Sequence, residues 1–228
     1  MAKSTDRLTP IYPPMTLHSD HSLRVVIDAT DLQAGQTGER ALEQRITPTE
    51  SRITLRSLRA GEAWTHDGGK LLEVLVVRGH LTLNGEALGT GSYARQAPGV
   101  PASFQATEAS MVYLNERTPS EHETDSYALR GDALDWRQGM VPGLKVTSLH
   151  QGLTKHTALV RWAPETRFNP HTHVGGEEIL VLAGVFRDEH GSYPAGTWIR
   201  SPHLSNHRPF TGPEGATILV KVGHLDVP

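Results

Sequence analysis

The residues best suited to chemistry in this sequence are two histidines and a glutamate that lie close together. His171 and His173 are two positions apart, and on a β-strand residues i and i+2 project from the same face. Gly175 and Gly176 then permit a tight turn, after which Glu177 would open the next strand beside the two rings. The spacing therefore predicts two imidazoles and a carboxylate that share one space.

A fourth candidate is His207, which follows a predicted strand and turn at residues 196–202. Three neutral imidazoles and a carboxylate form a mixed nitrogen and oxygen site that suits Zn, Fe, Mn, Ni or Cu better than Ca or Mg. In octahedral geometry two positions would stay open for water, oxygen or substrate. His203, close to His207, competes with it for the fourth place. The predicted metal ligands are His171, His173, Glu177 and His207.

The composition narrows the classes of function. The 228 residues include 13 histidines and no cysteine, which excludes disulfides, thiolate metal sites and iron–sulfur clusters. With a net charge of −3 and no cluster of Lys and Arg, nucleic-acid binding is disfavoured. The first 14 residues lack the apolar run of a signal peptide, and no segment reaches the ~18 apolar residues of a membrane helix. We therefore expect a cytoplasmic protein without a membrane partner.

Short β runs separated by Gly and Pro turns dominate the pattern from about residue 20 onward. Residues 71–77, 157–162 and 179–182 are rich in Val, Leu and Thr, which is typical of strands. Residues 38–46 are the best candidate for a helix. Many short strands at close spacing predict a β-sandwich or barrel.

An internal repeat indicates that the β unit is duplicated. Four pairs of landmarks keep an offset of 104 or 105 positions: Gly79 and Gly184, Gly91 and Gly196, Pro98 and Pro202, and Asp31 and Asp135. We expect a flexible lead-in at residues 1–20, a first repeat at 21–116, a polar linker at 117–126 and a second repeat at 127–228. The prediction is an all-β chain of two β-barrels in tandem.

The motifs of the second repeat resemble those of the cupin superfamily. His171-x-His173-x3-Glu177-x6-Gly184 is similar to the first cupin motif, although Glu165 replaces its opening glycine. Gly196-x5-Pro202-x4-His207 is similar to the second, with Leu204 at its inner glycine and Thr211 at its closing asparagine, and this similarity favours His207 over His203 as the ligand. The resemblance implies a bicupin, that is, two jelly-roll barrels, and a metal held by the four predicted ligands.

Residues 126–224 resemble the cupin domain of ChrR-type proteins more closely still. The stretches 157–161, 176–178, 181–186 and 193–196 carry this resemblance. ChrR proteins are zinc-binding anti-sigma factors that answer photooxidative stress through a separate helical zinc-binding domain. This chain has no cysteine and a β-rich first half, so only the cupin module is expected to carry over.

The first repeat lacks the ligand pattern of the second. Leu72 stands at the position of Glu177 and Ser103 at that of His207, and His66 has no companion ligand nearby. Because a metal needs several ligands together, we expect this barrel to be structural or interfacial.

Other residues near the motifs are expected to have structural roles. Glu178 should face the opposite side of the strand from Glu177, as a solvated or ion-pairing carboxylate. We expect ordinary core or rim packing for Arg161, Phe186, Trp198 and Arg200, and exposure for His156, His190 and His224.

Two functions follow from the predicted site. The first is a ChrR-like sensor or regulatory module that responds to an oxidant or small metabolite through a divalent metal, with zinc expected first and Fe, Mn or Ni as alternatives. It would act on a regulatory protein partner. The second is a metal-dependent dioxygenase for an aromatic or diketone substrate, in which the metal is Lewis acid and template. A homodimer is compatible with either function, because sheet edges favour pairing.

Overall fold

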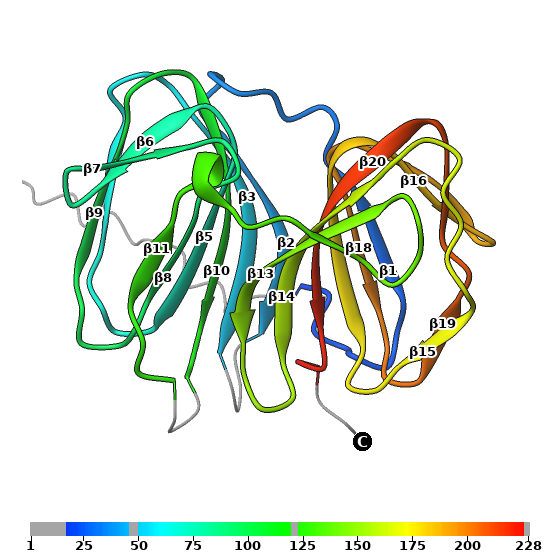
Figure 1. Cartoon of the computed structure of the whole chain (residues 1–228). Helices are drawn as coiled ribbons and strands as arrows, with labels where there is room; N and C mark the ends of the chain where they lie inside the picture. Colours follow the sequence, from blue (N-terminus) through cyan, green and yellow to red (C-terminus); the bar gives the residue numbers. More distant parts are fainter. Residues whose placement is uncertain (1–16, 46–49, 120–122, 226–228) are drawn as a thin grey trace, which may run out of the picture.

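The computed structural model describes residues 17–45, 50–119 and 123–225 of the chain. These residues form twenty β-strands and one short 3-10 turn, η1 (Gly131–Ala133), and contain no α-helix. The strands build two barrels that lie side by side, which confirms the predicted all-β bicupin (Figure 1). The described residues hold no helix suited to crossing a membrane.

The N-terminal barrel is made of a six-stranded and a four-stranded sheet. The larger sheet has the order β11-β8-β5-β10-β3-β2, and the smaller has the order β4-β9-β6-β7. The strands are β2 (Gly38–Arg45), β3 (Ser51–Leu58), β4 (Ala63–His66), β5 (Leu71–Arg78), β6 (His80–Leu83), β7 (Glu86–Gly89), β8 (Tyr93–Gln96), β9 (Ala102–Ala106), β10 (Ser110–Arg117) and β11 (Tyr127–Leu129). A cluster of buried apolar residues from both sheets, among them Leu72, Val74 and Phe104, fills this barrel.

The C-terminal barrel is made of an eight-stranded sheet and a two-stranded sheet. The larger has the order β1-β18-β16-β20-β14-β13-β12, with β17 also paired to β16, and the smaller is β15-β19. The strands are β1 (Val25–Asp28), β12 (Arg137–Gln138), β13 (Leu144–Gln151), β14 (His156–Trp162), β15 (His171–His173), β16 (Glu177–Asp188), β17 (Gly191–Pro194), β18 (Thr197–Ser201), β19 (Ser205–His207) and β20 (Phe210–Val222). Its interior is packed with Trp162, Ile179, Phe186 and their neighbours.

The prediction of a helix at residues 38–46 is wrong. Residues 38–45 form β2, which pairs antiparallel with β3, and residue 46 lies outside the described residues. Leu42 of β2 is completely buried. The Glu, Ala, Leu and Gln residues here favour a helix locally, but pairing with β3 and burial of Leu42 outweigh that small preference.

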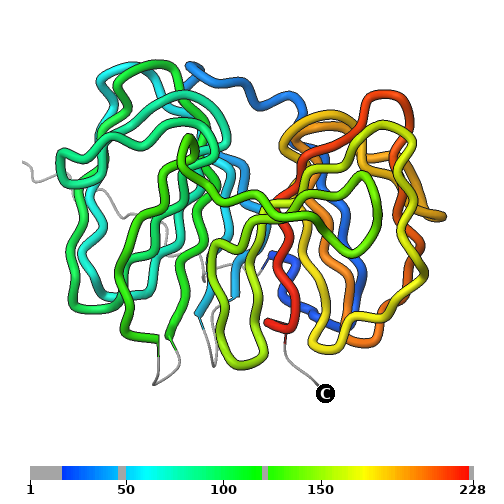
Figure 2. The backbone as a smooth tube through the Cα atoms, viewed as in Figure 1, coloured from blue at the N-terminus to red at the C-terminus, as the bar shows by residue number. Residues whose placement is uncertain are grey.

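Each larger sheet contains a strand from the other half of the chain. Strand β1, at the start of the described chain, pairs with β18, so that Val25 lies opposite Arg200 in the C-terminal barrel. Strand β11, after the predicted linker, pairs with β8 in the N-terminal barrel. Figure 2 shows the blue N-terminal segment within the C-terminal barrel. The repeats expected at 21–116 and 127–228 are therefore not the same units as the sheets, because one edge strand of each larger sheet comes from the other half.

The two larger sheets face each other across an interface that we call the seam. Its apolar part joins buried residues of both barrels, such as Leu55 and Tyr113 with Leu180 and Trp198. Buried polar contacts cross it as well: Lys221 Nζ to Glu73 Oε2 at 2.7 Å, the Tyr113 hydroxyl to Glu178 Oε1 at 2.6 Å, and Arg200 to Glu43. Burial tends to raise the pKa of Glu73, but Lys221, Arg117 and Arg95 outweigh it and hold that pKa well below its usual range.

We predict that Lys221→Met destabilises the protein by about 1.5–3 kcal/mol, because it removes the charged partner of Glu73 across the seam while Arg95 still pairs with that carboxylate. Urea unfolding measures the loss. The control is Lys145→Met, which removes the same charge from an exposed position on β13 and should change the free energy of unfolding by less than about 0.5 kcal/mol. Equal stability of the two variants would show that the pair across the seam contributes nothing.

Candidate metal centre

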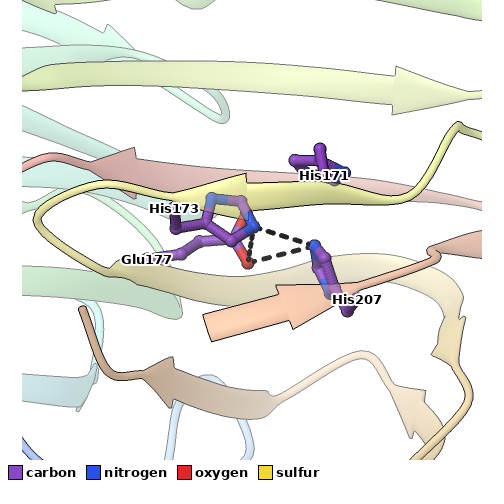
Figure 3. A group of neighbouring side chains, drawn as sticks. All are labelled: His171, His173, Glu177 and His207. Atoms are coloured by element: carbon purple, nitrogen blue, oxygen red, sulfur yellow. Dashed lines mark hydrogen bonds and ion pairs between the residues drawn. The ribbon is translucent and has the colours of Figure 1, made fainter. Parts of the chain in front are cut away.

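The four predicted ligands converge at one end of the C-terminal barrel (Figure 3). His171 and His173 project from the same face of β15, as predicted. Strand β15 pairs with β19 so that His171 lies opposite His207. Glu177 is the first residue of β16 and reaches the imidazoles of His173 and His207 from the neighbouring sheet.

The turn between β15 and β16 depends on its two glycines. Gly175 and Gly176 both have positive φ, at 76° and 71°. A Cβ on Gly175 would lie 2.7 Å from Gly223 Cα, and one on Gly176 would lie 2.4 Å from a methyl carbon of Leu225. Only glycine fits both the backbone conformation and the space, so this pair places Glu177 beside the histidines.

The distances match those between ligands of a single metal ion. His173 Nε2 and His207 Nε2 are 3.1 Å apart, and each lies 3.5 Å from Glu177 Oε2. With metal–nitrogen bonds of about 2.0–2.1 Å, ligand atoms at right angles are about 3 Å apart and opposite ones about 4 Å. The ligand atoms of all four residues lie within 4.8 Å of one another. Small side-chain movements would bring them to coordination distance.

In His171 and His207, the Nδ1 atom contacts a group outside the set of four ligands. His171 Nδ1 lies 2.9 Å from the Asn169 carbonyl, so Nδ1–H donates and Nε2 keeps its lone pair. His207 Nδ1 faces the buried Asp188 carboxylate at 3.7 Å. Such outer contacts orient metal-binding imidazoles and make them more basic.

Asp188 is the residue that the sequence analysis missed. Its Oδ1 accepts hydrogen bonds from the Tyr193 hydroxyl and from the backbone N–H groups of His190 and Gly191, at 2.8–3.0 Å. Arg24 lies 3.4 Å from its other oxygen. No spacing rule connects Asp188 to His207 or to Arg24, which is 164 positions away. A carboxylate at the last position of the long strand β16 was the only local signal.

The electrostatics of the four ligands favour a bound cation. Burial raises the pKa of Glu177 to about 7. Burial, together with the neighbouring His207 and His171, lowers the pKa of His173 to about 3. Burial tends to lower the pKa of His207, but Asp188 and Glu177 outweigh it and raise that pKa. A buried carboxylate and a neutral imidazole are costly without a partner, and a metal ion would stabilise both.

Aromatic rings surround the centre. Phe168 packs edge-on against His171 at 4.9 Å between ring centroids, and Phe186 lies 6.3 Å from His207. Trp162 contacts both phenylalanines from deeper in the barrel. None of the four ligands lines any of five cavities found in the described part of the chain. His171 is the least buried of the four ligands.

His203 and Glu178 have roles outside the centre. The Nδ1 atom of His203 accepts the backbone N–H of Gly175 at 2.8 Å, so His203 supports the ligand turn and does not compete with His207. Glu178 faces away from the ligands, as predicted. It is buried in the seam, where it accepts hydrogen bonds from Tyr113 and Trp198. The solvated alternative is wrong, because the N-terminal barrel covers this face of the strand.

Two further histidine expectations need correction. His224 is not exposed, because its ring lies in the seam 3.3 Å from Glu178 Oε2. His156 is half-buried and its Nε2 contacts Ser148, whereas His190 is exposed as expected. The seam explains these differences.

The four residues for which we expected core or rim packing are divided between the barrel interior, the seam and the surface. Phe186 and Trp198 are in cores, the first inside the barrel and the second in the seam. Arg200 is completely buried against Glu43, and Arg161 is exposed and stacks on Trp136.

In the described residues of the N-terminal barrel, the positions that correspond to the metal ligands do not form a similar cluster of histidines and a carboxylate. Leu72 belongs to the barrel core, and Ser103 hydrogen-bonds Asn84. His66 pairs with Glu116 at 3.2 Å and contacts the Lys70 carbonyl. That this barrel holds no metal remains a prediction.

Part of the sequence and most of the fold are similar to known proteins. The family model of the ChrR Cupin-like domain matches residues 124–226. No curated protein matches the sequence. Several solved structures share the fold at low identity, so these likenesses concern the fold alone.

Three of these structures cover nearly the whole chain. A candidate glyoxylate-induced protein from Pseudomonas aeruginosa has a TM-score of 0.70 and 15% identity, over 95% of this chain and 97% of that one. A candidate dioxygenase from Nostoc punctiforme has a TM-score of 0.69 and 15% identity, over 90% and 85%. The salicylate 1,2-dioxygenase of Pseudoaminobacter salicylatoxidans, solved as a mutant in complex with gentisate, has a TM-score of 0.61 and 11% identity, over 95% and 84%. The chain therefore has the cupin fold, and over residues 124–226 it matches the ChrR Cupin-like domain.

Proposed function

We propose that the C-terminal barrel is a metal-binding sensor or regulatory module. It would bind one divalent metal ion through His171, His173, Glu177 and His207, and it would respond to an oxidant or a small metabolite. The observation that carries the proposal is the convergence of three imidazoles and a buried carboxylate within 4.8 Å. The match to the ChrR Cupin-like domain over the same residues supports it.

The donor set fits a transition metal. Nitrogen and carboxylate donors of this kind suit Zn first and also Fe, Mn or Ni. The lone pair of His171 Nε2 is free for a metal, because Nδ1 donates to the Asn169 carbonyl. When bound, the ion would supply a Lewis acid with exchangeable positions. The protein would hold these donors in place through the glycine turn and Asp188.

A regulatory role is supported by the surface next to the ligands. Val174 follows His173 directly and is 70% exposed, and Leu204 is 60% exposed. The backbone N–H of Leu204 donates to the His173 carbonyl at 2.9 Å. Leu204 has φ at 60° where the cupin motif has glycine, a conformation that costs a β-carbon residue free energy. A movement of His173 would therefore move two exposed apolar side chains that a protein partner could contact.

A dioxygenase is the second candidate function, with an aromatic or diketone substrate. The fold similarity to salicylate 1,2-dioxygenase and the open coordination positions favour it. The aromatic packing of Trp162, Phe168 and Phe186 beside the ligands leaves less room for such a substrate and favours the sensor. Under either function we propose a cytoplasmic location, consistent with the absence of cysteine.

We predict that elemental analysis finds about one divalent metal ion per chain in the purified protein and that His173→Ala loses it. Asp188→Asn should keep the ion but bind it about 10- to 100-fold more weakly, because His207 loses its charged partner. His80→Ala, which removes an exposed histidine of the N-terminal barrel, is the control and should bind as the unmodified protein does. If His173→Ala bound metal as tightly as His80→Ala, the proposed site would be wrong.

We predict that Glu177 destabilises the metal-free protein as the pH rises. Its pKa in the folded protein is about 7, against an ordinary value of 4.5. The stability that the protonated carboxyl group gives the folded state is therefore fully present below pH 4.5 and is lost as the pH rises through 7. Above pH 7, metal-free Glu177→Gln should be more stable than the unmodified protein by on the order of 3 kcal/mol. Urea unfolding with a chelator measures this difference.

Adding zinc provides the matched test of the same variant. The unmodified protein should then become the more stable one, because only the carboxylate completes the ligand set. If the order of stability did not change with zinc, Glu177 would not be a ligand.

We predict that amide hydrogen exchange and oxygen consumption together distinguish a sensor from a dioxygenase. For a sensor, hydrogen peroxide added to the metal-loaded protein should increase amide hydrogen exchange around residues 174 and 204, and His173→Ala should show the faster exchange without peroxide. For a dioxygenase, the iron-loaded protein should consume oxygen with gentisate or acetylacetone, and His173→Ala should not. Oxygen consumption of this kind, together with unchanged exchange, would reject the sensor.

A further inference from the structure

A second polar cavity lies in the seam, away from the four histidine and glutamate ligands. It has a volume of about 130 Å³ and is lined by both barrels. The N-terminal barrel contributes residues of β2, β3, β5 and β10, and the C-terminal barrel contributes residues of β13, β14 and β20. The charged and histidine side chains in its wall are His21, Glu43, Arg45, Glu50, Glu73, Arg117, His150, Lys155, His156, Lys221 and His224.

The carboxylates of this wall already have cationic partners. Glu73 is paired with Lys221 at 2.7 Å, Glu50 with Lys70 at 2.5 Å, and Glu43 with Arg200. Among the cations, Arg117 is paired with Glu123. These pairs leave no free carboxylate in the described part of the wall for a further cation.

Lys155 differs from the other cations of the wall. Within the described residues its ammonium group makes no hydrogen bond or ion pair, although the side chain is half-buried. Burial and the nearby Arg117 lower its pKa. A half-buried lysine side chain that is near a second cation and has no paired anion would gain free energy from a negative ligand.

Asn115 provides the second unmet contact in the cavity. It is 3% exposed, and its Nδ2 donates to Glu73 Oε2 at 3.0 Å. The amide must therefore direct its Oδ1 elsewhere, because the reversed amide would set oxygen against the carboxylate. Oδ1 is buried and accepts no hydrogen bond within the described residues. A buried acceptor without a donor is costly, so a ligand that brings a donor would be stabilised here.

We propose that this cavity binds a small hydroxycarboxylate. Its carboxylate would pair with the Lys155 ammonium, and its hydroxyl would donate to Asn115 Oδ1. An apolar cavity of about 150 Å³ holds benzene, so a ligand of roughly six non-hydrogen atoms is the size that fits. Glycolate and lactate are the simplest members of this class. The site lies between the barrels, whereas the four metal ligands lie inside one of them, so the proposal does not rest on metal binding.

The test is a calorimetric titration of the chelator-treated protein with glycolate and, separately, with lactate. Saturable binding is expected, and acetate, which lacks the hydroxyl donor, should bind several-fold more weakly. Lys155→Met should weaken glycolate binding about 10- to 100-fold, because it removes the charged partner and keeps the side-chain length. Lys145→Met, which removes an exposed lysine of β13 outside the cavity wall, should bind glycolate as the unmodified protein does.

The His173→Ala variant separates this site from the proposed metal centre. Glycolate binding that persists in His173→Ala and is lost in Lys155→Met supports the site in the seam. Binding that is lost in His173→Ala but unchanged in Lys155→Met would place the anion at the metal centre and overturn the proposal. The absence of saturable binding by either anion would overturn it too.

Discussion

The alternation of side chains along β16 is the constraint on which the rest of the structure depends. Successive residues of a strand face opposite sides, so Glu177 points into the barrel toward His173 and His207. Glu178, the next residue, points into the seam and accepts the Tyr113 hydroxyl from the other barrel. A shift of β16 by one residue would exchange these two carboxylates and remove both the candidate metal site and a contact across the seam.

The seam uses buried charge as well as apolar area. Lys221 lies opposite Glu178 on the neighbouring strand β20 and reaches across to Glu73. Replacing such buried pairs by apolar residues often leaves stability unchanged, but removing one partner is costly. The pairs therefore specify how the two barrels fit together more than they add net stability. This explains how a barrel without the ligand pattern can be essential to the fold: it supplies the partners for the back of the ligand-bearing sheet.

The sequence predicted the features set by local spacing and missed those set by contacts between distant segments. The alternation at His171 and His173, the glycine turn and the position of His207 are local, and the structure brings these residues together as expected. Asp188 and the burial of His224 depend on strands that pair or pack far along the chain. The same holds for β1, whose pairing with β18 has no signature in its own four residues.

The paired strands β16 and β20 contribute to both candidate binding regions, the metal centre and the cavity in the seam. Glu177 begins β16 in the metal centre, and Val222 lies opposite it on β20 and lines the seam cavity. His224, two residues further, lies against Glu178. A ligand in either region would therefore restrict the same pair of strands. Because binding that orders shared backbone lowers the entropic cost of a second binding event, occupancy of the two regions should be coupled even though no side chain contacts both ligands.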